Sequence, residues 1–257
     1  MSARAMVRGL FSAASAMLVF ARRQDLLAND LANATTPAYR TEVAPVEAFP
    51  EMTIFREYRA SRAYRGQVGT GAFIERSYTI WETPPVRYTG RSLDVAIEGE
   101  GFFVVQTPAG QRLTRAGHFV LTAEGVLATP DGHPVLGEGG PIQAAGVSEA
   151  ELLITDDGAV LDGQGRVLGR LLVVDVADRT GLVREGANRF QWTADAGPME
   201  PVAARVRQGM LEGSATDVAA TMVEMIAGVR AYDAASRAVQ AHDRMTEALI
   251  TQMGRTN

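Results

Sequence analysis

Residues 214–253 read SATDVAATMVEMIAGVRAYDAASRAVQAHDRMTEALITQM, and the pattern in this segment is the most specific feature of the chain. Its apolar and small residues recur at alternating steps of three and four, which predicts a long helix with a heptad seam. A helix of about 38 residues is about 57 Å long, more than the diameter of a small domain. We therefore expect it to project from the body or to pack along a partner. Ser214 and Asp217, three residues apart, predict a variant of the N-terminal capping box.

The N-terminal residues 4–33 show the same pattern on a shorter scale. Steps of three and four connect Leu10, Met17, Leu27 and Leu31, and Pro37 ends the helix. The two terminal helices are expected to pair, and the stripe from Val239 to Met253 is expected to need another chain. The alternative is that the seam is an ordinary intramolecular core. The candidate assembly interface is Leu10, Met17, Leu27, Leu31, Val218, Met222, Met225, Val229, Tyr232, Val239 and Leu249.

The middle of the chain differs from both ends. Short apolar runs such as FFVV (102–105) alternate with Asp-Gly and other glycine turns, which is typical of an antiparallel β domain. The predicted fold class is α+β: paired long terminal helices, as a coiled-coil stalk, with a central antiparallel all-β domain. The expected divisions are an N-terminal stalk helix at 1–36, an extended connector at 37–65, a β-rich head at 66–212 and a C-terminal stalk helix at 213–257.

Composition limits the possible functions. The 257 residues are 46% hydrophobic and 21% charged, which supports a real core and excludes a mainly disordered chain. No uncharged apolar run reaches the length of a membrane-spanning helix, so no stable membrane insertion is expected. The net charge of −5 argues against a nucleic-acid partner. Arg56, Arg59, Arg62 and Arg65, with Tyr58 and Tyr64 between them, are interpreted instead as a basic subunit-contact strip.

The sequence lacks motifs typical of catalysis or metal binding. The chain has no cysteine, and its three histidines, His118, His133 and His242, are scattered without metal-ligand spacing. No GxSxG or HExxH motif occurs, so the expectation is no catalytic residue, no cofactor, no metal and no enzymatic activity. Arg4 and Arg8 precede about a dozen apolar or small residues, as in a weak secretory signal. The seam continues past Arg22 to Leu31, which favours an uncleaved helix.

Several motifs, in order along the chain, resemble the axial proteins of the bacterial flagellar rod and hook. They are NDLANATTPAYR (29–40), TGRSLDVAIEGEGFF (89–103), LTRAGHF (113–119), GHPVLGEGGPI (132–142), and GMLEGS (209–214) followed by MVEMIAGVRAY (222–232). The motif residues singled out are Asn29, Leu31, Ala32, Asn33, Leu93, Asp94, Gly99, Gly101 and Phe102. Asp30 and Ala38 depart from the family's Asn and Gly, and alanine disfavours a positive-φ turn at position 38.

The resemblance implies a structural axial subunit of the basal-body rod that polymerises through its terminal helices and transmits motor torque. The length favours a rod protein over the longer hook protein, and the GEGGPI segment (137–142) favours the proximal over the distal rod type; a distal rod or hook-type subunit is the alternative. The implied partners are other rod and hook proteins, copies of itself and the flagellar type III export apparatus. The implied location is the basal body, reached by export, in the periplasm if the cell is Gram-negative.

Two readings from other classes stay open. One is a secreted β-domain hydrolase with a helical oligomerisation stalk, which needs a concave pocket with converging polar groups in residues 90–200. The other is a phage tail or adhesin fibre. Under the rod interpretation, the terminal helices are expected to be mobile in the free monomer and ordered on assembly.

Overall fold

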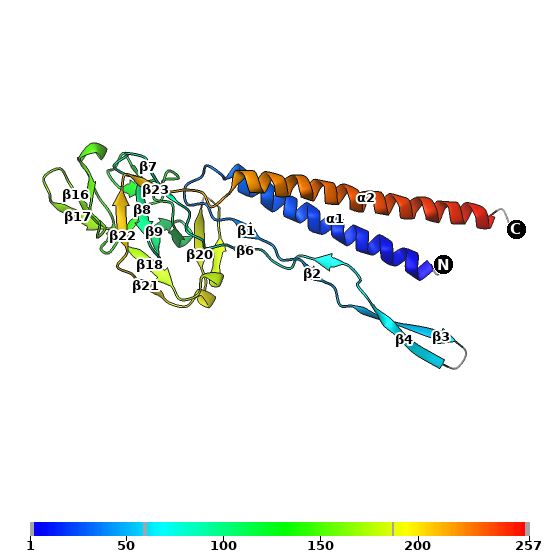
Figure 1. Ribbon diagram of the computed structural model, residues 1–257. Coiled ribbons are helices and arrows are strands. Elements are labelled where there is room, and N and C mark those ends of the chain that lie inside the picture. Colours follow the sequence, from blue (N-terminus) through cyan, green and yellow to red (C-terminus); the bar gives the residue numbers. More distant parts are fainter. Residues whose placement is uncertain (1–2, 59–60, 187, 255–257) are drawn as a thin grey trace. The chain divides into compact units, whose positions relative to one another are not determined.

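The computed structural model describes residues 3–58, 61–186 and 188–254, and these form two compact units (Figure 1). The helical unit comprises the described parts of 1–32, 42–78 and 217–257, and the β unit comprises 33–41 and 79–216. The fold class is α+β, as expected. Among the described residues, no helix has the length and apolar character needed to cross a bilayer.

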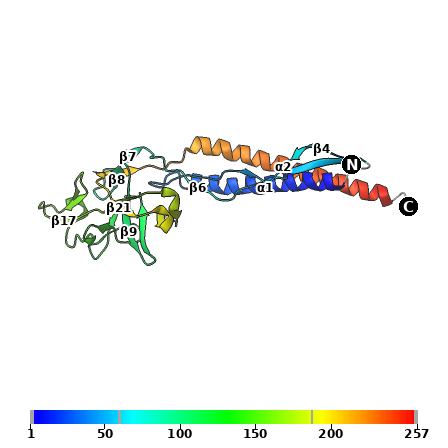
Figure 2. The same cartoon turned by 90° about the horizontal axis from the view of Figure 1, so that it is seen from below.

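Two long helices dominate the helical unit. α1 (Ala3–Ala32) and α2 (Val218–Gly254) lie side by side and run in opposite directions (Figures 1 and 2). Asp217 begins α2 as its N-cap, because its carboxylate accepts hydrogen bonds from the backbone N–H groups of Ala219 (3.0 Å) and Ala220 (3.1 Å). The predicted capping box at Ser214 is wrong: the Ser214 hydroxyl accepts from the Thr216 N–H at 3.2 Å, in a turn before the helix.

The rest of the helical unit is a ladder of short strands. They are β1 (Glu42–Val43), β2 (Glu47–Ala48), β3 (Met52–Tyr58), β4 (Ser61–Val68) and β5 (Ala72–Phe73), and β6 (Tyr78–Thr79) lies at the division between the units. β3 and β4 pair as an antiparallel hairpin with a bulge after Ile54, and Phe55 meets Tyr64 edge to face.

The hairpin occupies much of the segment that was expected to be an extended connector, residues 37–65. The expected boundary at residue 66 falls inside β4, because the Thr, Ile, Phe and Tyr content of this arginine-rich stretch favours strands. In the proposed basic strip, Tyr64 and Arg65 are exposed on β4. Arg59 and the side chains of Arg56, Tyr58 and Arg62 lie outside the described residues.

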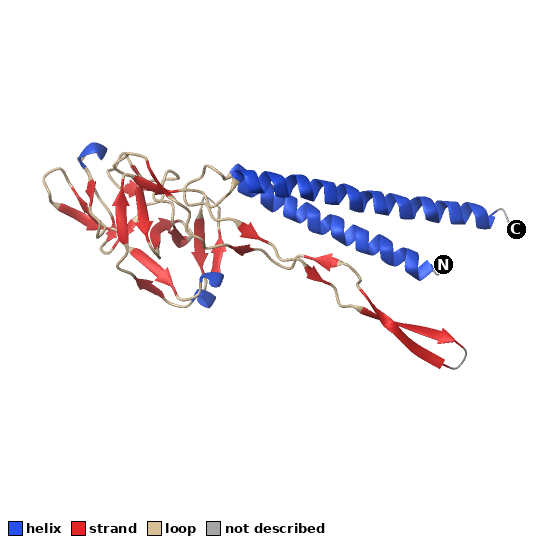
Figure 3. Cartoon of the chain, in the orientation of Figure 1, coloured by secondary structure: helices blue, strands red, loops and turns tan. Residues whose placement is uncertain are grey.

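In its described residues, the β unit is built from antiparallel strands and three short 3-10 turns. Figure 3 colours the strands red and the helical turns blue. A six-stranded sheet has the order β19-β20-β10-β9-β18-β21. The strands are β7 (Val86–Tyr88), β8 (Val95–Glu98), β9 (Phe102–Thr107), β10 (Gly110–Thr114), β11 (Val120–Leu121), β12 (Leu127–Ala128), β13 (Leu136–Gly137), β14 (Gly140–Pro141), β15 (Leu153–Ile154), β16 (Ala159–Leu161), β17 (Val167–Arg170), β18 (Val173–Val176), β19 (Leu182–Arg184), β20 (Arg189–Trp192), β21 (Met199–Pro201), β22 (Arg205–Gln208) and β23 (Met210–Glu212). The 3-10 turns are η1 (Glu149–Glu151), η2 (Arg179–Gly181) and η3 (Ala194–Ala196).

β9 explains why the core lies in this unit. Successive strand side chains point to opposite faces, and both faces of β9 are covered. Phe103 and Val105 belong to one buried cluster, with Phe119 and Val135, whereas Phe102 and Val104 belong to a second. A strand buried on both sides needs an unbroken apolar run, which is what the FFVV sequence supplies.

Candidate assembly surfaces

The face of α2 that packs on α1 is formed mainly by small residues. Thr221 is buried, and Met225, Gly228, Ala235 and Val239 follow at helical spacing as half-buried positions. A Cβ atom on Gly228 would lie 3.0 Å from Gln24 Oε1, and one on Gly9 would lie 2.5 Å from His242 Nε2. The helices therefore approach closely at both glycines.

The predicted α1 seam is half-buried throughout. Leu10, Met17, Leu27 and Leu31 all keep some exposure, whereas Val19, which falls outside the predicted seam, is buried. Val19 lies one turn beyond Ser15, whose hydroxyl accepts a hydrogen bond from the backbone N–H of Ala72 in β5 at 3.2 Å. β5 therefore lies against α1 one turn from Val19, and helical periodicity alone does not reveal such a contact.

A second apolar stripe of α2 is exposed, and we call it the exposed apolar face. Its largest exposed fractions are 68% at Val223 and 55% at Ile226. On α1, Phe11 is 66% exposed and Leu18, seven residues later, is 74% exposed. The face consists of Val218, Met222, Val223, Ile226 and Val229.

The structure therefore divides the α2 seam that the sequence suggested. Met225 and Val239 are half-buried on the side that packs on α1, whereas Val218, Met222 and Val229 belong to the exposed apolar face, and Tyr232 is exposed. At 100° per residue, the two stripes lie side by side on one helix. The sequence analysis missed Val223 and Ile226 because neither fits the chosen heptad register. The side chain of Leu249 lies outside the described residues.

A cavity opens between the two helices beside this face. Its volume is about 240 Å³, and an ion pair between Arg23 and Glu224 (3.8 Å) lies at its edge. The remaining lining residues are Phe20, Gln24, Leu27, Ala227, Gly228 and Ala231. The cavity exists because small residues follow one another on this side of α2.

The motif residues in the middle of the chain have structural positions. Leu93 and Phe102 are buried, and the Asp94 carboxylate lies 2.9 Å from His118 Nδ1. Gly99 and Gly101 adopt φ values of 107° and 113° in the β8–β9 turn. A Cβ on Gly101 would lie 2.7 Å from Val173 Cγ1, so this tight turn requires glycine.

The other motif residues end α1. Asn29, Leu31 and Ala32 occupy its last turn, and the side-chain oxygen of Asn33 accepts a hydrogen bond from the Thr36 hydroxyl at 3.1 Å. These residues lead into the segment 37–40, where the chain enters the β unit.

A buried ionic junction joins that segment to the returning chain. Glu212 accepts from Arg40 Nη2 at 2.6 Å and from Arg115 Nε at 3.1 Å, and all three side chains are at least nine-tenths buried. Ala38 donates its N–H to the carbonyls of Glu212 (2.9 Å) and Gly213 (3.1 Å), and it adopts a φ of 56°. The expectation that alanine avoids a positive φ here was wrong, because these hydrogen bonds fix the turn.

This junction was not predicted from the sequence, although the segments that build it belong to the family motifs. PAYR (37–40) and GMLEGS (209–214) were noted for their resemblance, but nothing in either indicates that Arg40 meets Glu212, 172 residues away. Burial lowers the pKa of Arg40, since desolvation of the guanidinium outweighs its attraction to Glu212. The junction therefore costs solvation energy that its hydrogen bonds must offset.

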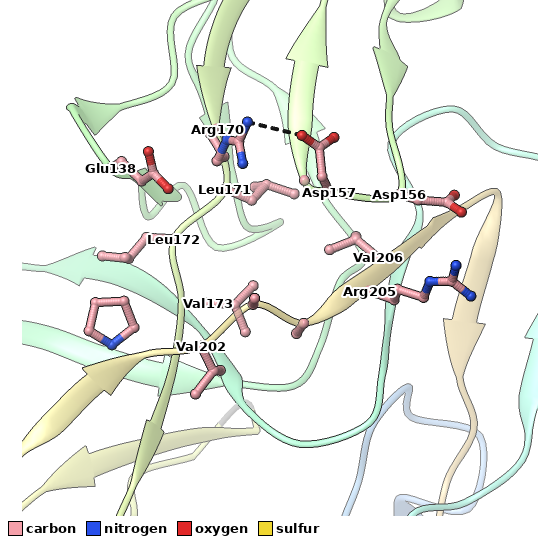
Figure 4. A pocket seen from close by; sticks show the side chains of 14 residues that line it. Glu138, Asp156, Asp157, Arg170, Leu171, Leu172, Val173, Val202, Arg205 and Val206 are labelled. Atoms are coloured by element: carbon pink, nitrogen blue, oxygen red, sulfur yellow. Dashed lines mark ion pairs between the residues drawn. The ribbon is translucent and has the colours of Figure 1, made fainter.

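A groove in the β unit bears on the hydrolase alternative (Figure 4). It has a volume of about 410 Å³, and Leu171, Val173 and Val206 line it between charged groups. Arg170 pairs with Asp157 at 2.9 Å. The Thr155 hydroxyl donates to Asp157 and holds the pKa of that carboxyl below its usual value, which suits a permanent ion pair better than a proton carrier.

The same groove offers no nucleophile–base pair. Among its fourteen lining residues, all within the described part of the chain, none is a serine, threonine or histidine. No three His, Asp or Glu side chains of the described residues gather in a way that could hold a metal ion. The expectation that the chain catalyses no reaction stays a prediction.

Two family models and several known proteins match this chain. Residues 207–253 match the family described as "Flagellar basal body rod FlgEFG protein C-terminal", and residues 96–163 match "Flagellar hook protein FlgE/F/G D1 domain". The flagellar basal-body rod protein FlgF of Caulobacter vibrioides is 30% identical over 98% of this chain and 100% of its own length. FlgF of Rhizobium meliloti is 33% identical over 89% of this chain and 90% of its own.

A relative of the other rod type matches almost equally well. The flagellar basal-body rod protein FlgG of Bacillus subtilis is 28% identical over 95% of this chain and 98% of its own length. The chain belongs to the flagellar basal-body rod protein family. It is a structural subunit of the bacterial flagellar rod and is located in the basal body.

Proposed function

We propose that this rod subunit assembles through α1 and α2, which pair as a coiled-coil stalk, and that the exposed apolar face packs against neighbouring subunits. The observation that carries the proposal is the exposure of Met222, Ile226 and Val229 at helical spacing. Soluble monomers rarely leave a contiguous apolar stripe in water without a partner for it.

The energetics favour this use of the face. Burying one large aliphatic side chain contributes about 1.5–3 kcal/mol, so the five side chains of the exposed apolar face supply a substantial contact. The cavity beside Gly228 adds a hole into which a side chain of a neighbouring helix can insert. Ordering of the helices and loss of rigid-body freedom offset part of this gain.

The form of the assembly follows from the kind of contact. If the exposed apolar face meets a different surface of the next copy, the contact is heterologous and generates an open helical filament. Such a filament, built from this subunit and from other rod and hook proteins, would carry motor torque. We also propose that the chain reaches its position through the flagellar type III export apparatus and that it catalyses no reaction.

The position along the rod is the finer part of the proposal. We place the subunit in the proximal rod, as a FlgF-type protein, on the strength of the GEGGPI segment, whereas its length favours a rod protein over the longer hook protein. A distal rod or hook-type subunit is the alternative. Labelling the subunit in purified basal bodies distinguishes these positions: a signal confined to the distal rod or the hook would refute the proximal assignment.

Replacement of Ile226 by aspartate tests the assembly proposal. Ile226 is exposed, so Ile226→Asp should leave the monomer folded while placing a charge inside the subunit contact. We expect loss of swimming in a strain carrying only this variant, and basal bodies without a complete rod. Ala238→Asp adds the same charge at an exposed position of α2 outside the exposed apolar face, and it should swim normally. Normal motility of Ile226→Asp would refute assembly through this face.

A further inference from the structure

A small cavity in the β unit is lined by three arginines. Its volume is about 160 Å³, and Arg40, Arg115 and Arg179 supply its positive charge. Trp81 and Phe102 form an apolar wall, with their rings edge to face at 5.5 Å. The other lining residues are Thr83, Gly99, Glu100 and Gly101.

The hydrogen-bond donors of these arginines are unequally occupied. Arg115 uses all three nitrogens: Nε binds Glu212, Nη1 binds the Gly101 carbonyl at 2.6 Å, and Nη2 binds the Gly99 carbonyl at 2.8 Å. Arg40 uses only Nη2. Its Nε and Nη1 are buried and have no hydrogen-bond partner among the described residues.

The positive charges of these arginines are also incompletely compensated by neighbouring carboxylates. Arg40, Arg115 and Glu212 are nearly fully buried, so this group carries one excess positive charge away from water. Arg179 faces Asp175 at 2.9 Å and Glu100 at 3.4 Å, but the Glu100 side chain is 76% exposed, and solvent screens its charge. Burial and the neighbouring Arg115 and Arg179 charges all lower the pKa of Arg40, which indicates that Glu212 compensates it incompletely.

We propose that this cavity binds a small oxyanion, a carboxylate or phosphate group, between Arg40 and Arg179. An arginine presents its donors in a planar fork that matches two oxygen atoms of such a group. The cavity exceeds the roughly 30 Å³ that one water occupies several-fold, so a small oxyanion fits. The aromatic wall lowers the local dielectric and strengthens the attraction. The oxyanion comes either from solution or from an acidic side chain of another subunit.

Titration of inorganic phosphate into the full-length chain tests the site. We expect saturable binding, seen as broadening of the phosphorus NMR signal, and a rise of about 3 °C in Tm at tenfold the half-saturating concentration. Sodium chloride at equal ionic strength should not reproduce either effect.

Two variants locate the binding. Arg179→Gln should lose at least about tenfold in affinity and should still fold, because Arg179 is partly exposed. Arg40→Met should lose the binding as well, and if that variant does not fold, Arg179→Gln decides alone. Arg205→Gln, which removes an exposed arginine from the groove of Figure 4, should bind phosphate normally. Absence of saturable binding, or unchanged binding in Arg179→Gln, would overturn the proposal.

A second measurement identifies the source of the oxyanion. Self-association of the wild-type chain is followed by sedimentation in saturating phosphate and in matched chloride. If phosphate weakens association of the wild type but not of Arg179→Gln, a carboxylate of another copy occupies the cavity. If association is unchanged while phosphate binds, the occupant is a free oxyanion.

Discussion

Glu212 shows at the residue scale how one carboxylate joins distant segments of this chain. It accepts from Arg40 and from Arg115, which lie 172 and 97 residues away in sequence. A buried ion pair contributes little net stability over an apolar replacement, but removal of one partner leaves an uncompensated charge. The junction therefore holds together the segments that enter and leave the β unit, and loss of the shared carboxylate should be costly.

Replacement of Glu212 by glutamine tests this role. Glu212→Gln leaves two buried arginines without a counter-charge and should lower the free energy of unfolding by about 3–5 kcal/mol, measured by urea denaturation. Arg40→Met should cost less, because the pair between Glu212 and Arg115 survives it. The control is Glu224→Gln, at an exposed ion pair with Arg23, which should cost less than about 1 kcal/mol. Equal costs at positions 212 and 224 would contradict a structural role for the junction.

Ala38 adopts a backbone conformation that alanine disfavours. An alanine with positive φ costs about 1–2 kcal/mol, and this cost led the sequence analysis to disfavour the turn. The structure keeps the turn, because the Ala38 N–H reaches two carbonyls of the returning chain. Contacts between distant segments override the local preference.

At the element scale, α2 carries two neighbouring stripes with different environments. The periodicity correctly predicted a helix that ends close to residue 253, and the structure has it at Val218–Gly254. The periodicity could not tell which stripe meets α1, because a heptad spacing defines faces without naming their partners. The face of α2 that meets α1 is the one that carries Gly228, because Gly228 and Gly9 allow the two helices to approach closely.

The first turn of α2 offers a direct test of its N-cap. Asp217→Ala removes the carboxylate that accepts from two backbone N–H groups and should destabilise the helix start by about 1 kcal/mol. Ser214→Ala should change little, since its hydroxyl accepts only from Thr216 in the preceding turn. Amide exchange at residues 219–222 measures both effects. Faster exchange in Ser214→Ala than in Asp217→Ala would restore the capping box that the sequence suggested.

At the scale of the whole molecule, the buried core is unevenly distributed. Within the described residues of the helical unit, the buried side chains are Val19, Asp30, Ala44 and Thr221. The two large apolar clusters both lie in the β unit. Since local stability follows buried apolar contact, the helical unit is expected to open more readily in a free subunit.

Hydrogen exchange on a dilute, strictly monomeric sample tests this expectation. Amides of β9 and β10 should be protected at least about tenfold more than those of residues 218–250 of α2. Assembly should then raise the protection of α2, because the exposed apolar face becomes covered. Strong protection of α2 in the monomer, equal to that of β9, would contradict mobile terminal helices.

The two terminal helices, the antiparallel β middle and the membership of the rod family could all be predicted from the amino-acid sequence. Helical periodicity, glycine turns and the order of motifs are signals along the sequence, and they can be recognised without the folded structure. The FFVV run likewise predicted a strand, and the structure shows why it has no polar face.

Which distant residues meet became visible only in the folded chain. Contacts between distant segments form the junction of Arg40, Glu212 and Arg115 and place β5 against α1. Pairing of β3 with β4 forms the hairpin. Packing of α2 on α1 leaves Met225 half-buried and the adjacent Ile226 exposed. Such contacts depend on chain geometry and on the close approach that small residues allow. A pattern read along one segment does not contain them.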